Sequence, residues 1–109
     1  MIYEVEVSEQ AERDLREIFE YIAFELQSPE NAIGQLDRLE EQILSLDAMP
    51  KRYRKDEKEP WKSRELHILP VDNYVILYIP NSDKKVVTIL RVMYAGRDID
   101  NQLNFHTKQ

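Results

Sequence analysis

The sequence predicts an α+β fold in which an N-terminal strand and an antiparallel helical hairpin precede a three-stranded antiparallel meander. Two observations predict it. Apolar residues recur every three or four positions through the first half of the chain, as they do on one face of a helix. In the second half they gather in three short runs separated by turn residues, as in β-strands. We therefore expect the helices to cover one face of the sheet and to leave the other face partly open.

The first strand and the first helix are predicted from the opening residues of the chain. Residues 2–7 alternate between apolar and acidic side chains, which indicates a strand. Ser8 is then expected to cap a helix over residues 9–27, because its hydroxyl can accept a hydrogen bond from the free N–H groups of the first turn. The apolar stripe of this helix consists of Ala11, Leu15, Ile18, Ile22 and Leu26.

A second helix is predicted to begin at Ser28 and Pro29. Proline at the first helical position loses no hydrogen bond, and the serine before it is expected to act as the cap. The helix is expected to end near Met49 and Pro50. Its stripe consists of Leu36, Leu39, Ile43 and Leu46. Because the loop before it has only a few residues, the two helices should pack as an antiparallel hairpin.

The second half of the chain predicts a loop followed by the meander. Residues 51–60 are dense in charge and have no apolar period, which indicates an exposed basic loop. Strands are predicted over residues 64–69, 73–79 and 85–94, joined by short segments rich in turn residues. In the last strand, regular alternation would place on one face Val87, Ile89, Arg91 and Met93.

Length and composition predict a single domain spanning residues 1–109, with a flexible tail from about residue 102. Cysteine is absent, which excludes disulfides, thiolate metal sites and thiol nucleophiles, and which suits a reducing cytoplasm. The N-terminus does not have the pattern of a signal peptide. The longest apolar run, Tyr74–Ile79, is far shorter than the roughly 20 residues that cross a bilayer, so we expect a soluble cytoplasmic protein without a membrane partner.

Charge is distributed unevenly along the chain. The formal net charge is −6. Residues 1–50 hold three basic and thirteen acidic residues, a net of −10, whereas residues 51–109 hold twelve basic and eight acidic residues, a net of +4. The basic second half points to an acidic or polyanionic partner there.

Arg91 is the most notable candidate for a functional site, because an arginine inside an apolar strand must be paired or must face a cleft. It either forms a structural ion pair with an acid such as Glu65 or Asp98, or it is a site residue. Arg64 and His67 fall on opposite faces of the first meander strand. Arg64 is the better site candidate of the two, whereas His67 is more simply a partly buried, hydrogen-bonded histidine.

The end of the last strand carries two further candidates. The Tyr94 phenol and the Arg97 guanidinium could address a phosphate or a carboxylate of a partner. The simpler alternatives are core packing for Tyr94 and a surface ion pair with Asp98 for Arg97. Trp61 is expected to act as a lid over the core rather than to stack on a base.

Other motifs for chemistry are missing from the sequence. The two glycines, Gly34 and Gly96, form no phosphate loop, and the two histidines, including His106 in the tail, form no metal motif. We therefore expect neither a cofactor nor a metal.

Four segments in this order resemble the RelE/ParE superfamily of toxins. They are residues 7–22 beginning Val-Ser-Glu-Gln-Ala-Glu-Arg-Asp-Leu, residues 46–50 Leu-Asp-Ala-Met-Pro, residues 73–78 Asn-Tyr-Val-Ile-Leu-Tyr, and residues 89–99 Ile-Leu-Arg-Val-Met-Tyr-Ala-Gly-Arg-Asp-Ile. The last segment is the most telling one, because it is an arginine-bearing strand that ends in Tyr-Ala-Gly-Arg-Asp-Ile. The fold of the family, a helical hairpin on an antiparallel sheet, agrees with the fold predicted from periodicity.

The resemblance implies a toxin of a type II toxin–antitoxin module that arrests growth unless a cognate antitoxin neutralises it. RelE-like members cut messenger RNA on the ribosome with basic residues and no metal, whereas ParE-like members inhibit DNA gyrase without catalysis of their own. The Gly-Arg-Asp-Ile ending resembles the ParE branch more closely, so gyrase is the favoured target. The alternatives are RNA cleavage and, from another class, a non-toxic protein-binding module on the same fold.

The resemblance also assigns candidate catalytic residues, which apply only if the protein is RelE-like. Arg64 and Arg91 match positions where RNA-cleaving members hold basic residues, and Tyr94 or Arg97 would lie near the scissile phosphate. Whichever target applies, the antitoxin tail is expected to bind the sheet side and the basic half of the chain.

Overall fold

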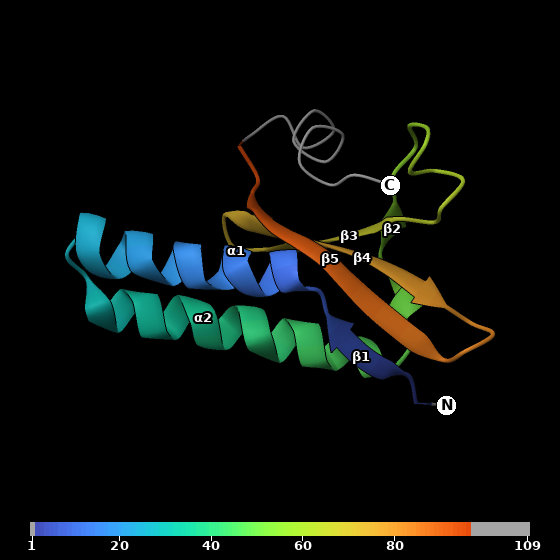
Figure 1. Cartoon of the computed structure of the whole chain (residues 1–109), viewed down its shortest axis with the longest axis horizontal. Helices are drawn as coiled ribbons and strands as arrows, with labels where there is room; N and C mark the ends of the chain where they lie inside the picture. Colours follow the sequence, from blue (N-terminus) through green and yellow to red (C-terminus); the bar gives the residue numbers. More distant parts are fainter. Residues whose placement is uncertain (1, 97–109) are drawn as a thin grey trace.

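The structure is a computed structural model, and it describes residues 2–96 (Figure 1). Within this part of the chain, no helix is both long enough and apolar enough to cross a membrane. The elements in chain order are β1 (Glu4–Val7), α1 (Glu9–Glu20), a π-helix (Tyr21–Glu25), α2 (Pro29–Leu44), two short 3₁₀ helices (Ser45–Asp47 and Pro50–Arg52), β2 (Arg54–Lys55), β3 (His67–Val71), β4 (Tyr74–Asn81) and β5 (Val86–Tyr94).

The helical hairpin forms as predicted, and Figure 1 shows α1 and α2 lying side by side. Ser8 is the expected cap, because its Oγ accepts a hydrogen bond from the Ala11 N–H at 3.0 Å. The same hydroxyl donates to the Leu90 carbonyl at 2.9 Å, which fixes the start of α1 to β5. Because the Ser8 hydroxyl bonds to the first turn of α1 and to β5 at once, it sets how α1 lies on the sheet.

The two helices end differently from the prediction. The first continues as a π-helix from Tyr21, in which the N–H of Leu26 bonds to the Tyr21 carbonyl at 3.0 Å. Pro29 begins α2 as predicted, but within the described residues the Ser28 side chain caps no N–H, so the predicted serine cap is wrong. The α2 helix stops at Leu44, because the chain tightens into a 3₁₀ turn before Met49 adopts a left-handed conformation with φ 48°.

The meander is confirmed, and it belongs to a five-stranded mixed sheet in the order β1-β5-β4-β3-β2. The first strand lies parallel to β5, with Glu4 opposite Val86 and Val7 opposite Ile89. All other neighbours are antiparallel. The predicted basic loop is exposed at its basic residues, but it also contributes the two-residue edge strand β2, which the sequence did not reveal.

Each face of the sheet carries its own core. On the helix face lie Ala11, Leu39, Ile43, Leu46, Leu69, Val71, Ile76, Tyr78, Val87, Ile89 and Val92. On the other face lie Trp61, Leu66, Ile68, Val75, Leu77 and Met93. Trp61 and Leu66 cover part of this second face, which the sequence predicted to be partly open. Trp61 is only 1% exposed, so its predicted role as a lid is confirmed.

A β-bulge interrupts the pairing of β4 with β5. Leu77 lies opposite Arg91 and Tyr78 lies opposite Ile89, so Leu90 is an additional residue in β5. The predicted alternation of β5 is consequently wrong for Val92 and Met93. Val92 packs with the helix-face core and Met93 with the opposite one. An additional residue in one strand reverses the faces of all residues that follow it.

Candidate functional site

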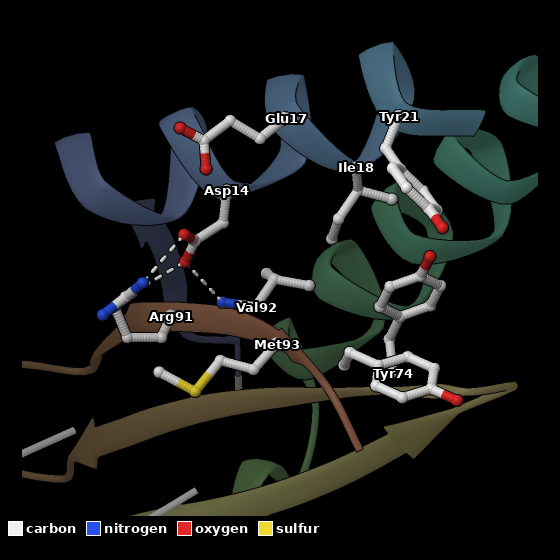
Figure 2. A pocket seen from close by; sticks show the side chains of 9 residues that line it. Asp14, Glu17, Ile18, Tyr21, Tyr74, Arg91, Val92 and Met93 are labelled. Atoms are coloured by element: carbon white, nitrogen blue, oxygen red, sulfur yellow. Dashed lines mark hydrogen bonds and ion pairs between the residues drawn. The ribbon is translucent and has the colours of Figure 1, made fainter. Parts of the chain in front are cut away.

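Arg91 and Asp14 form a largely buried ion pair between β5 and α1 (Figure 2). The guanidinium donates from Nε to Asp14 Oδ2 at 2.8 Å and from Nη2 to Oδ1 at 3.0 Å. Asp14 Oδ2 also accepts a hydrogen bond from the Val92 N–H at 3.0 Å. The two side chains are 13% and 10% exposed. The carboxylate is therefore held by three donors, two of them on a cation.

Arg91 directly follows the bulge and reaches α1. Its register partner, Leu77, belongs to the core on the far face of the sheet, yet the Arg91 guanidinium meets a helix on the near face. A bulge bends its strand and redirects side chains, and Leu90 supplies the additional residue directly before Arg91. The ion pair that the sequence considered for Arg91 exists, but its acid is Asp14, which the sequence analysis did not name. Asp98 lies outside the described residues.

A groove of about 430 Å³ opens beside this ion pair, between α1 and the end of β5. Figure 2 shows the charged side chains toward one end and tyrosine rings toward the other. The described residues that line it are Asp14, Glu17, Ile18, Tyr21, Tyr74, Arg91, Val92, Met93 and Tyr94. Asp14, Glu17, Ile18 and Tyr21 recur at three- and four-residue steps, so one face of α1 and the start of the π-helix form one wall.

Three tyrosines converge at one end of the groove. The rings of Tyr74 and Tyr94 meet edge to face, with centroids 6.0 Å apart and planes at 76°. Burial raises the pKa of the Tyr74 phenol, and the nearby Tyr21 and Tyr94 phenols raise it further. Tyr74 therefore remains a neutral hydroxyl at physiological pH. Tyr21 and Tyr94 are 54% and 50% exposed, so much of this aromatic surface faces solvent.

Gly96 is the residue that lets the Tyr94 ring lie where it does. A Cβ added at Gly96 would come within 2.5 Å of Tyr94 Cε2, closer than two carbon atoms can approach. The backbone after the strand is held in place because the Ala95 N–H donates to the Asn73 carbonyl at 2.8 Å. In this Tyr-Ala-Gly sequence the ring of Tyr94 therefore folds back over the backbone of Gly96, where no side chain is in its way.

Comparison with known proteins identifies the chain. The family model of the "ParE toxin of type II toxin-antitoxin system, parDE" matches residues 5–99. The chain belongs to the ParE toxin family. It is thus a toxin of the RelE/ParE superfamily, as its sequence motifs suggested. No curated protein matches it.

Solved structures with the ParE-like fold come from both branches of the superfamily. The chromosomal ParDE system from P. aeruginosa aligns with a TM-score of 0.69 and 19% identity, over 85% of this chain and 96% of that one. The RelBE2 toxin–antitoxin complex from Mycobacterium tuberculosis aligns with a TM-score of 0.64 and 22% identity, over 86% of this chain and 99% of that one. A mutant of the E. coli toxin RelE in the free state aligns with a TM-score of 0.66 and 15% identity, over 94% of this chain and 93% of that one. At these identities the likeness establishes the fold.

In this ParE-family chain, the structure brings two of the four candidate catalytic residues together. Arg91 and Tyr94 both line the groove. Arg64 is not among the described residues that line it: it lies in the turn before β3, with its guanidinium carbon 5.2 Å from the centroid of the Trp61 ring. Arg97 and His106 lie outside the described residues, as does the predicted tail from about residue 102. The catalytic roles of Arg64, Arg91, Tyr94 and Arg97 stay predictions.

His67 is the buried histidine that the sequence favoured. Its ring stacks on Tyr78 with centroids 5.4 Å apart, and Nδ1 lies 2.8 Å from the Glu65 carbonyl oxygen. Burial lowers its pKa, with the nearby Lys55 and Lys51 acting in the same direction. A neutral histidine packed in the sheet has a structural role.

The sequence analysis missed four groove residues: Asp14, Glu17, Tyr21 and Tyr74. They lie in the segments 7–22 and 73–78 that resemble the toxin family, but the helical spacing of Asp14, Glu17 and Tyr21 resembles the solvated face of any surface helix.

Proposed function

We propose that this toxin arrests growth by inhibiting DNA gyrase without cutting RNA, and that a cognate antitoxin neutralises it. The match of the ParE family model over residues 5–99 supports the gyrase target, because the sequence resemblance assigns gyrase inhibition to the ParE branch. The similar solved structures include toxin–antitoxin complexes, which supports an antitoxin partner for this chain as well.

The electrostatics of the groove support gyrase rather than RNA as the target. Among the described residues that line it, Asp14 and Glu17 are acidic and Arg91 alone is basic, which gives a net charge of −1. Arg91 is already held by both Asp14 oxygens. A phosphodiester would have to displace a carboxylate from the guanidinium and approach a second carboxylate. This environment disfavours an RNA backbone, which binds where basic residues gather.

RelE-like cleavage of messenger RNA is the second candidate, and one observation favours it. Arg91 and Tyr94 share the groove, so a guanidinium and a phenol could face the same phosphate once Asp14 releases Arg91. Arg64 would then contribute from outside the groove.

One induction experiment in bacteria separates these proposals. The protein is expressed alone, and the topology of a reporter plasmid and the 5′ ends of messenger RNAs are followed as growth stops. We expect plasmids to relax while messenger RNAs remain uncut, and co-expression of the protein encoded by the adjacent reading frame to restore growth. If messenger RNA is cut while the plasmid stays normally supercoiled, the target is RNA and not gyrase. Normal growth at confirmed expression would favour a non-toxic binding module.

A further inference from the structure

An apolar patch is exposed at the end of the helical hairpin. Phe24 and Leu26, at the end of the π-helix, are 71% and 55% exposed, and Ile33, in the first turns of α2, is 53% exposed. We call these three side chains the tip patch. None of them lines the groove. Figure 1 shows the turn between α1 and α2 at the left of the view, where it projects beyond the strands of the sheet.

The packing of the two helices presents Phe24 and Ile33 together. Ala23 and Ala32 belong to one buried cluster of the hairpin, and Phe24 and Ile33 each follow one of these alanines in the sequence. Because the helices run in opposite directions, the residue after each alanine turns toward the same side of the hairpin. The two apolar side chains therefore flank the helix contact on one face.

The π-helix adds Leu26 to this exposed region. Apolar periodicity predicts Leu26 on the buried stripe of the first helix, yet it is exposed. A π-helix bonds each N–H to the carbonyl five residues earlier, as Leu26 does to Tyr21, so the residues after Tyr21 leave the α-helical phase. Such segments are rare and are frequent at functional sites. Tyr21 also lines the groove, so the π-helix connects the groove to the tip patch.

The charged residues of this part of the hairpin are all acidic. Residues 17–37 contain five acidic residues and no lysine or arginine, a net charge of −5. All five are exposed: Glu17, Glu20, Glu25, Glu30 and Asp37. Glu30 and Asp37 lie three residues before and four residues after Ile33, which places them beside it on the same face of α2. A complementary surface is therefore apolar at its centre and basic around it.

DNA gyrase, the proposed target, supplies the charge that this surface requires. An enzyme that handles DNA carries basic residues where it contacts the phosphate backbone. We propose that the tip patch docks on gyrase, at an apolar surface bordered by basic residues, with Phe24 as the central anchor. This inference rests on the proposed gyrase target.

Two other occupants match the tip patch less well. A second copy of the chain would bring the same five acidic residues against it, and like charges that face each other oppose association. The antitoxin tail that suits the basic residues 51–64 is acidic, so the tip patch would repel it as well. Charge complementarity therefore favours the DNA enzyme over both.

Inhibition of purified gyrase by matched pairs of toxin variants tests the docking site. Phe24→Ala and Ile33→Ala are compared with Leu44→Ala, which removes an exposed apolar side chain at the opposite end of α2. Glu20→Lys is compared with Glu40→Lys, the same charge reversal at an exposed position four residues before Leu44. We expect the half-inhibitory concentration to rise about tenfold or more for Phe24→Ala, about threefold or more for Ile33→Ala and Glu20→Lys, and less than about twofold for the two controls.

Binding to the protein encoded by the adjacent reading frame is the control for folding and for specificity. Its Kd, measured by titration calorimetry, should change less than about twofold for every variant, because the proposed antitoxin surface lies in the basic half of the chain. Phe24→Leu keeps an apolar side chain at the anchor and should retain most of the inhibition. A rise in the antitoxin Kd that parallels the loss of gyrase inhibition would assign the tip patch to the antitoxin and overturn the inference.

The gyrase assay also separates the docking site from the target. If the unmodified toxin and Phe24→Ala inhibit gyrase equally well, the docking site is wrong while gyrase remains the target. If the unmodified toxin leaves gyrase fully active, the proposed target is wrong, and the docking site with it. Sedimentation of the toxin as a dimer that Phe24→Ala converts to a monomer would make a second copy the occupant instead of gyrase.

Discussion

Asp14 and Arg91 lie 77 residues apart in the sequence and are joined by two hydrogen bonds of 2.8 and 3.0 Å. The first belongs to α1 and the second follows a bulge in β5, so a single ion pair ties the helical hairpin to the strand. It also forms the charged end of the groove that we consider the functional surface.

Removing one partner of this ion pair should be costly. Asp14→Ala leaves the Arg91 charge largely buried without its carboxylate and also frees the Val92 N–H, so we expect unfolding to become easier by about 3 kcal/mol. Urea denaturation measures this. The double variant with Arg91→Ala should recover part of the loss, because it removes the orphaned charge. Arg38→Ala is the control: it breaks an exposed ion pair with Asp72 and should cost far less. Equal losses of stability for Asp14→Ala and Arg38→Ala would contradict the account.

Arg91→Ala needs the same measurement before any loss of toxicity is interpreted, because it leaves Asp14 unpaired and can act by unfolding the protein.

Gly96→Ala should displace the Tyr94 ring from the groove, because the new Cβ would lie 2.5 Å from Cε2. We expect growth arrest to weaken while the fold persists, since the clash lies at the end of β5. Gly34→Ala is a matched control in the interior of α2, where the Cβ would approach only the flexible end of Arg38 at 3.3 Å. Helix propensity predicts a gain of up to about 1 kcal/mol there. Growth assays and thermal melting of both variants provide the comparison, and undiminished arrest by Gly96→Ala would show that the position of Tyr94 is unimportant.

His67 should make the protein less stable in mild acid. Burial lowers its pKa in the folded state, so the unfolded chain binds a proton more readily. The contribution of His67 is fully present above the unfolded pKa of about 6.5, and it is lost as pH falls from that value toward the lower folded pKa. Unfolding free energies measured between about pH 7.5 and 5.5 should fall less for His67→Gln than for the unmodified protein. The same pH dependence in both proteins would assign the effect to other groups.

Binding of an acidic antitoxin tail to the basic half of the chain should depend on salt. Seven basic side chains are exposed along residues 51–64: Lys51, Arg52, Arg54, Lys55, Lys58, Lys62 and Arg64. Charge-steered association slows as ions screen it, so the association rate should fall between about 50 and 500 mM salt. Stopped-flow measurements across this range test the prediction, and a rate that does not change would argue against steering by this surface.

Local patterns predicted the helices and, apart from β2, the order of the strands along the chain, because caps, proline and apolar periodicity act within a few residues. Ser8 and Pro29 begin their helices where the sequence places them. The misplaced start of the first meander strand also has a local cause: Glu65 adopts a left-handed conformation with φ 58°, which no pattern of apolar residues signals. The strand begins at His67 as a result, and Arg64 remains in the turn.

The groove was harder to predict, because it depends on contacts between distant residues. An additional residue at Leu90 changes which faces Val92 and Met93 occupy, and alternation alone assumes that no such residue exists. The choice of Asp14 among many acids follows from where α1 crosses β5, which is a property of the folded chain. Family resemblance singled out Arg91 and Tyr94, whereas the tyrosines that complete the groove became recognisable only in three dimensions.

Supercoiling by purified DNA gyrase in the presence of the purified toxin tests the central claim most directly. The account predicts that increasing toxin stops the conversion of relaxed to supercoiled plasmid, and that an equimolar amount of the antitoxin restores it. Full gyrase activity at every toxin concentration, together with cleavage of messenger RNA in a translating extract by the same preparation, would contradict it.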